Sequence, residues 1–185
     1  MIELSFYIKS VCVQGYGVED AIVNFTNGFN LIEGLSNHVK TMIVQFIEYA
    51  FGGRNHKDSL SLNIDSTSYM TVKVTLQTEQ GEVELVRNLV KNKSTIRVIS
   101  QDKRLLSGDY TANSSTDKKL NIGIALLRLI DIPTDLYLPK NEKRDPGHVS
   151  FNVLKPMWLL NENDMPNDES VLLPASNSGL LLSSL

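Results

Sequence analysis

The amino-acid sequence predicts an α/β fold with a mixed sheet and an attached antiparallel β lobe. Apolar and polar residues alternate over residues 2–8, which is the spacing of a strand with one buried face. Within residues 40–51 the apolar residues recur at helical spacing instead. Residues 72–98 return to alternation in short runs separated by polar turns, which is typical of an antiparallel meander.

The first third of the chain is predicted to contain short strands followed by a helix. Residues 20–33 indicate two strands around a turn at Asn27 and Gly28, a strong hairpin signal. The helix that follows has one apolar stripe, formed by Ile43, Phe46, Ile47 and Ala50. Gly52 and Gly53 come directly after it, where a left-handed cap is favoured, so we expect the helix to end there.

The remaining two thirds predict the meander, a second helix and several loops. Residues 107–118 are polar and rich in turn formers, which indicates a surface loop. A helix is predicted from about Asp117, and Pro133 ends it. Residues 139–147 form a charged loop, and the sequence finishes on the apolar segment SNSGLLLSSL. Because exposed leucines need a covering surface, we expect a chain cut from a longer protein.

Composition excludes several classes of protein. With 18 Lys and Arg against 21 Asp and Glu, the net charge is -3, so the protein is not strongly basic overall. Cys12 is the single cysteine, which excludes an internal disulfide framework and a cysteine-built zinc site and favours a small buried hydrophobe. No apolar run approaches the roughly 18 residues of a membrane span, and the first residues do not form a signal peptide. We expect a soluble cytoplasmic protein with no membrane partner.

The most informative motif is GLSNHVKT, residues 34–41, between a predicted strand and a predicted helix. Phosphate-binding loops have the form G-x-x-x-x-G-K-[ST] in that context. Lys40 would neutralise the phosphates and Thr41 would ligate Mg²⁺, while backbone amides at the helix start would bind the anion. Val39 replaces the second glycine of the motif. The predicted ATP-binding set is therefore Gly34, Ser36, Asn37, His38, Val39, Lys40 and Thr41. Two alternatives stay open: a chance match before an ordinary helix, and an exposed His38 that does not face phosphate.

The run FNLIEGLSNHVKTMIVQFIEYAFGG, residues 29–53, resembles the start of SMC-like ABC ATPase heads, which are P-loop NTPases. The resemblance implies a single N-terminal head lobe over residues 1–185, with strand, phosphate loop and helix in residues 1–60. It further implies an antiparallel β subdomain in residues 61–110 and a helical, Q-loop-like segment in residues 111–185. Glu162, or alternatively Asn161, would then take the Q-loop position near Mg²⁺ and the attacking water.

The function implied by this resemblance is ATP binding, with Mg²⁺, in DNA repair, chromosome maintenance or phage defence. The sequence contains no Walker-B carboxylates and no Ser-Gly-Gly signature. Activity would require the C-terminal half of the head or a partner subunit, in a homo-oligomer, so we expect the chain alone to be inactive. The alternative from another class is a scaffold or interaction subunit whose phosphate loop has decayed, which Val39 favours.

A second candidate site is a basic patch in residues 85–105. It consists of Arg87, Lys91, Lys93, Arg97, Lys103 and Arg104, with Asp102 as the only acidic residue within residues 85–105. Such a patch could follow the phosphates of DNA, and the binding would be salt-sensitive. The alternative is a solvated strand face with basic turns. A pure nucleic-acid-binding module that uses this patch is a third possible function.

Overall fold

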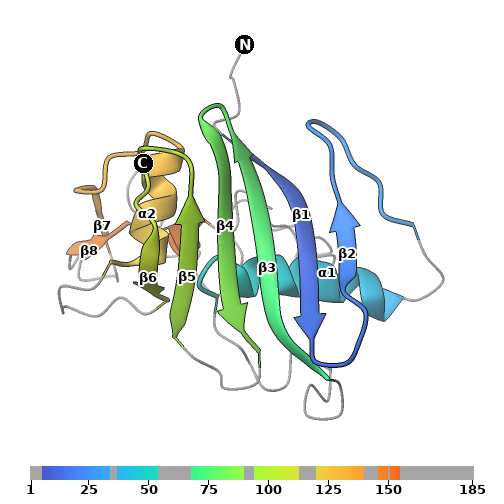
Figure 1. Cartoon of the computed structure of the whole chain (residues 1–185). Helices are drawn as coiled ribbons and strands as arrows, with labels where there is room; N and C mark the ends of the chain where they lie inside the picture. The colour runs from blue at the N-terminus through green and yellow to red at the C-terminus, as the bar shows by residue number, and fades with distance from the viewer. Residues whose placement is uncertain are drawn as a thin grey trace. The chain divides into compact units, whose positions relative to one another are not determined.

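The computed structural model describes residues 6–33, 37–53, 68–89, 94–112, 120–139, 146–149 and 151–154. The chain divides into two compact units, Met1–Asp131 and Ile132–Leu185. The first unit contains an α/β arrangement of one large sheet and two helices (Figure 1).

The sheet of the first unit has six strands in the order β2-β1-β3-β4-β5-β6. These strands are β1 (Phe6–Gly15), β2 (Ala21–Asn24), β3 (Tyr69–Thr78), β4 (Gly81–Asn88), β5 (Thr95–Ser100) and β6 (Gly108–Thr111). Every pairing between them is antiparallel, so the predicted mixed sheet is wrong. The predicted meander is confirmed as β3, β4 and β5, and it is continuous with the first strands because β3 pairs with β1.

Strand β1 continues well past residue 8, where the sequence alternation ends. The register with β3 shifts between Ile8 and Ser10, so one extra residue enters the strand there. The bulge changes which residues face the core, from Ile8 before it to Val11 and Val13 after it, each paired with an apolar residue of β3. Cys12 points to the opposite face and is buried with a free thiol, as predicted.

Two helices cover one face of the sheet and lie behind the strands in Figure 1. Helix α1 (Asn37–Ala50) packs on β1, β3 and β4, and helix α2 is Ile122–Leu129. The core between sheet and helices consists of fully buried side chains, among them Phe51, Val72, Val74, Leu76, Val83, Leu85, Ile96, Leu126 and Leu129. The apolar stripe predicted for α1 is confirmed at Ile43, Phe46 and Ala50, which are buried.

Helix α1 ends at the two glycines that the sequence indicated. Gly52 has a positive φ of 94°, a left-handed conformation that glycine adopts without steric cost. Its N–H donates to the Tyr49 carbonyl at 3.1 Å, and the Gly53 N–H donates to the Glu48 carbonyl at 2.9 Å. This pair of bonds is a Schellman cap, which satisfies carbonyls that the last helical turn leaves free.

The second helix and the preceding loop differ from their predicted bounds. Helix α2 begins at Ile122, later than predicted, because the Asn121 side chain accepts a hydrogen bond from the Ile124 N–H and caps the helix there. Residues 107–118 were expected to be loop, yet β6 lies within them. Tyr110 of β6 is buried opposite Ile96 of β5. Because of this pairing, the polar sequence of residues 108–111 forms a strand.

The second unit contains a short antiparallel hairpin of β7 (Tyr137–Pro139) and β8 (Pro146–His148), followed by a 3-10 turn, Phe151–Leu154. The predicted charged loop of residues 139–147 is therefore wrong at its two ends, where residues 139, 146 and 147 belong to strands, and residues 140–145 lie outside the described residues. No helix in the described parts of the chain has the length and apolar character that crossing a membrane requires.

Candidate functional site

The first turn of α1 is the described part of the predicted phosphate loop. The helix begins at Asn37, whereas the motif predicts a loop through Val39 and a helix from Lys40. Glycine would permit an irregular wrap at position 39, whereas valine costs less than glycine within a helix, so Val39 is compatible with the earlier helix start. Lys40 is half-buried and Thr41 is exposed. Gly34 and Ser36 lie outside the described residues, as do the side chains of Asn37, His38 and Val39.

The electrostatics of this helix start favour an anion. The N-terminal end of a helix carries partial positive charge from its unsatisfied N–H groups. The first turn of α1 has no acidic residue that would neutralise this charge, and Lys40 adds to it. The backbone and side chain of this turn therefore attract a phosphate group electrostatically.

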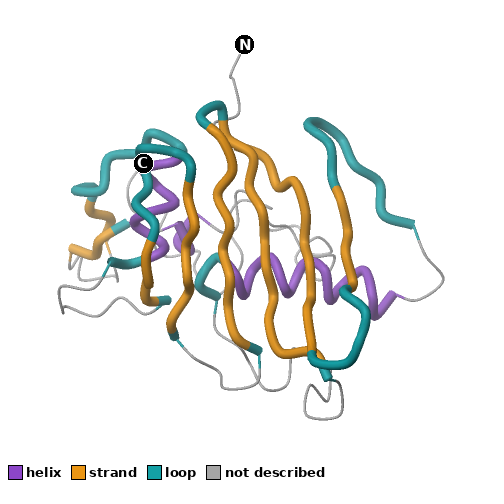
Figure 2. The backbone as a smooth tube through the Cα atoms, viewed as in Figure 1, coloured by secondary structure: helices purple, strands orange, loops and turns teal. Residues whose placement is uncertain are grey.

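The segment of residues 29–33, here called the entry segment, leads into this helix start and is not a strand. Figure 2 draws it as loop, which corrects the second of the two strands predicted in residues 20–33. Its backbone forms no hydrogen bond with any other described backbone group. Phe29 is 90% exposed and Leu31 is 69% exposed. A strand needs a neighbour for its N–H and C=O groups, and the described chain provides none here.

The turn before the entry segment is nevertheless held in one conformation. The Asn30 side chain accepts from the Thr26 N–H at 2.9 Å and donates to the carbonyls of Thr26 at 2.8 Å and Gly28 at 3.0 Å. Gly28 has a φ of 99°, which a tight turn at this point requires. The predicted Asn27-Gly28 turn is thus confirmed, although only β2 on its first side is a strand.

Arg87 of the basic patch is not a surface residue. It is 4% exposed and lies on the helix-facing side of β4, in line with Val83 and Leu85. Burial lowers the pKa of the Arg87 guanidinium, and burial also raises the pKa of the Tyr49 phenol beneath it. DNA phosphates cannot reach a buried guanidinium, so Arg87 is removed from the predicted patch.

The other described members of the patch are exposed or paired with carboxylates. The Arg97 Nε lies 3.3 Å from the Asp109 carboxylate, and the Arg104 Nη2 lies 2.8 Å from that of Asp102. Lys103 is exposed. Lys91 and Lys93 lie outside the described residues. The structure therefore does not bring the described members together as one free basic surface.

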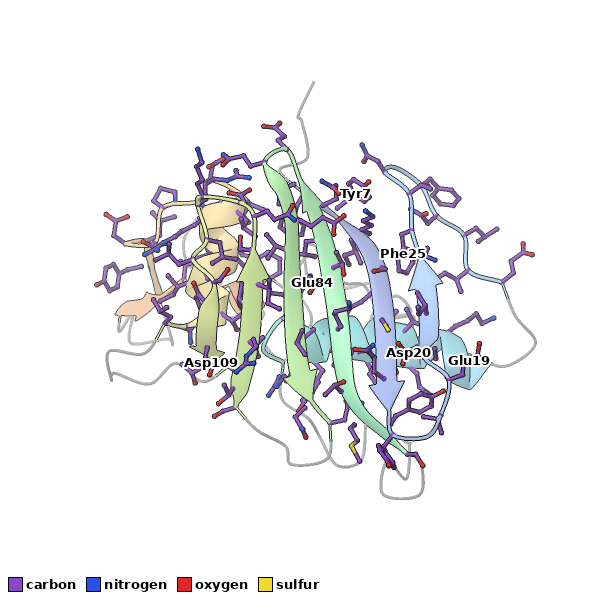
Figure 3. All side chains as sticks on the ribbon, viewed as in Figure 1. Tyr7, Glu19, Asp20, Phe25, Glu84 and Asp109 are labelled. Carbon is purple, nitrogen blue, oxygen red and sulfur yellow. The ribbon has the colours of Figure 1, made fainter. Side chains whose placement is uncertain are left out.

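The face of the sheet turned away from the helices carries ion pairs of opposite charge. Glu84, labelled in Figure 3, is 3.3 Å from the Lys73 ammonium, and Asp109 pairs with Arg97 as described above. Lys9 of β1 reaches across β3 to Glu82 of β4. Because Lys9, Lys73 and Arg97 each have a carboxylate partner, these cations give the described part of this face little net charge to attract a polyanion.

The donors present fit the phosphates of a nucleotide better than a metal ion alone. Among the described side chains at the α1 start, the Thr41 hydroxyl offers an oxygen to Mg²⁺. The described residues contain no group of three His, Cys, Asp or Glu side chains placed for a metal. Mg²⁺ at nucleotide sites takes few protein ligands, and the phosphates and water supply the rest. Glu162 and Asn161 lie outside the described residues, so the Q-loop position remains a prediction.

The contact between Arg87 and Tyr49 was not predicted from the sequence. The Arg87 guanidinium carbon lies 3.7 Å from the centre of the Tyr49 ring. A usable signal was present, because Arg87 occupies the apolar phase of an alternating strand, after Val83 and Leu85. An arginine at that phase indicates a buried partner rather than a solvent-facing charge.

Comparison of the chain with protein-family models, with curated proteins and with solved structures gave no match. The class that the described residues define is an α/β unit with a six-stranded antiparallel sheet and two helices.

Proposed function

We propose that this chain is the N-terminal lobe of an SMC-like ATPase head, which binds the phosphates of ATP at the start of α1. The observation that carries the proposal is the start of α1, whose first turn has no acidic residue and contains Lys40. The entry segment, residues 29–33, leads into this turn, exposes Phe29 and Leu31, and pairs with no other described strand. In this proposal a second polypeptide segment pairs with the entry segment. That pairing buries Phe29 and Leu31 and completes the site beside the helix start.

The roles of the site residues follow from their chemistry. The N–H groups of the first turn bind the phosphates, and Lys40 contributes a positive charge. Thr41 provides one oxygen ligand to the Mg²⁺ that accompanies the nucleotide. Glu162 would act near the metal in the complete head. DNA repair, chromosome maintenance and phage defence are the settings that the sequence resemblance favours.

A second candidate function is a scaffold or interaction subunit that uses the same lobe without nucleotide. The observation in its favour is the helical backbone of Asn37, His38 and Val39, where a phosphate loop would be irregular. The exposed entry segment serves this function equally well, since it needs only a partner strand. Nucleotide binding separates the two proposals.

Calorimetric titration with Mg-ATP tests the first proposal. We expect binding by the wild-type chain at millimolar or lower concentrations, and a loss of about tenfold or more for Lys40→Ala, since a charge-assisted contact contributes about 1.5–3 kcal/mol. Lys9→Ala is the matched control. Lys9 of β1 is an exposed cation that pairs with Glu82 of β4 on the face of the sheet turned away from α1. No heat of binding for the wild type, or equal losses for both variants, would favour the scaffold.

A further inference from the structure

Arg87 occupies a position where the alternation of β4 calls for an apolar residue. The side chains of Val83 and Leu85, which precede it on the same face, are completely buried. A charged side chain is costly in such a place unless hydrogen bonds compensate for its lost hydration. The contacts of Arg87 therefore show which groups compensate for the burial of its charge.

Those contacts lie at the C-terminal end of α1. The Arg87 Nη1 donates to the Tyr49 carbonyl at 2.5 Å and to the Gly53 carbonyl at 2.9 Å. These carbonyls belong to the last turn and the cap of the helix, where the backbone carries partial negative charge. The last turn has no basic residue of its own and contains Glu48, so the cation that meets this charge comes from the sheet.

Tyr49 of α1 makes two further contacts with β4. Its ring lies under the guanidinium at 3.7 Å, within the range of a cation–π interaction. Its hydroxyl donates to the Asn88 carbonyl of β4 at 2.7 Å. Consecutive residues of β4 thus contact one helix residue, Arg87 through its side chain and Asn88 through its backbone.

We propose that Arg87 is a positioning residue, which fixes the C-terminal end of α1 to β4 and thereby holds the whole helix in place on the sheet. The consequence for ligand binding rests on the proposed function: the start of the same helix, with Lys40, is the proposed phosphate site. A rigid helix transmits a restraint at one end to the other, so loosening Arg87 should displace the phosphate-binding turn without removing any group that contacts phosphate.

The geometry requires arginine in particular. A guanidinium can donate to two carbonyls while its flat face lies on a ring, whereas an ammonium is a compact charge without such a face. Lysine at position 87 should therefore restore the charge but only part of the restraint. Methionine should keep the volume and remove both.

Amide hydrogen exchange on the full chain tests the inference directly. We expect Arg87→Met to increase exchange at Gly52, Gly53 and the last turn of α1 by about tenfold or more, as for the loss of buried hydrogen bonds to a charged group. Arg87→Lys should give an intermediate increase. Tyr49→Phe, which removes only the bond to Asn88, should give a smaller one and covers the case in which Arg87→Met does not fold. Lys73→Met is the matched control, because Lys73 is a paired cation on the opposite face of the sheet.

The outcomes separate this inference from the proposed function. Unchanged exchange at α1 in Arg87→Lys and Tyr49→Phe, or an equal increase in Lys73→Met, would overturn the positioning role whatever the chain binds. Increased exchange at α1 alone supports it, even if the wild type proves not to bind Mg-ATP, in which case only the proposed function fails. If the wild type does bind, we expect Arg87→Lys to weaken Mg-ATP binding and Lys73→Met to leave it unchanged.

Discussion

The Asp102 carboxylate is completely buried in the turn between β5 and β6, and the Arg104 Nη2 donates to it at 2.8 Å. The Arg104 N–H and Nε donate to the same carboxylate, at 2.9 and 3.1 Å. The side-chain hydrogen bond from Arg104 is the main cause that lowers the Asp102 pKa from 3.8 to about 2. Arg104, a member of the predicted basic patch, therefore stabilises this turn of the fold.

We predict that this carboxylate makes stability depend on acid pH. Because the pKa of Asp102 is lower in the folded chain than in the unfolded one, its stabilisation is present above about pH 4 and is lost as the pH falls toward 2. The full effect is about 2 kcal/mol. Denaturant unfolding at pH 6 and at pH 2.5 should show a smaller pH dependence for Asp102→Asn than for the wild type. Asp109→Asn, at an exposed pair, should change stability by less than about 1 kcal/mol. The same pH dependence in wild type and Asp102→Asn would contradict this assignment.

DNA binding through the described part of the basic patch should be weak. We expect Arg97→Gln to leave the affinity for duplex DNA and its salt dependence unchanged, because Asp109 already neutralises Arg97. Asp109→Asn should instead steepen the slope of log affinity against log salt by about one unit, since it frees one cation for a phosphate. Fluorescence anisotropy with a labelled duplex over a series of salt concentrations measures both. A reduced slope for Arg97→Gln would mean that the ion pair opens on DNA.

Replacing Val39 by glycine should strengthen nucleotide binding. The first turn of α1 could then adopt an irregular loop around the phosphate, and relief of crowding is expected to contribute about 1–2 kcal/mol to Mg-ATP affinity. Adding Lys40→Ala should remove the gain. Val44→Gly is the control, because Val44 is an exposed residue of the same helix and should share the helix cost of about 1 kcal/mol without any gain in affinity. Equal calorimetric affinities for wild type, Val39→Gly and the double variant would favour the scaffold function.

The entry segment should govern association rather than stability. Phe29 and Leu31 are largely exposed, so replacing both by serine should change the free energy of unfolding by no more than about 0.5 kcal/mol. We expect the wild type to self-associate through these exposed apolar side chains, and the variant to lose that association. Sedimentation velocity measures the association. Leu76→Ala, at a completely buried position, should instead cost about 2–5 kcal/mol in stability. A wild type and a double variant that sediment identically as monomers would argue against an interaction role.

Parts of the fold were predictable because they depend on neighbouring residues in the chain. The apolar stripe and the glycine pair predict α1 and its end at Gly52, and the alternating runs predict the strands β3, β4 and β5. Asn27 and Gly28 likewise predict a turn whatever surrounds them. Each of these features follows from backbone preference or side-chain period within a few residues.

Other features depend on what packs against the chain, and only the tertiary structure decided them. The bulge after Ile8 changes the buried phase of β1, which a fixed period of two cannot anticipate. β6 forms because β5 offers an edge for pairing, while residues 29–33, with a stronger strand sequence, lack a described partner and form none. Arg87 lies in a basic run of the sequence although it occupies the apolar phase of β4, and only the fold supplies the carbonyls and ring at the end of α1 that make its burial favourable. Sequence by itself determines local conformation, whereas strand pairing and the burial of a charge depend on groups that the fold brings from elsewhere in the chain.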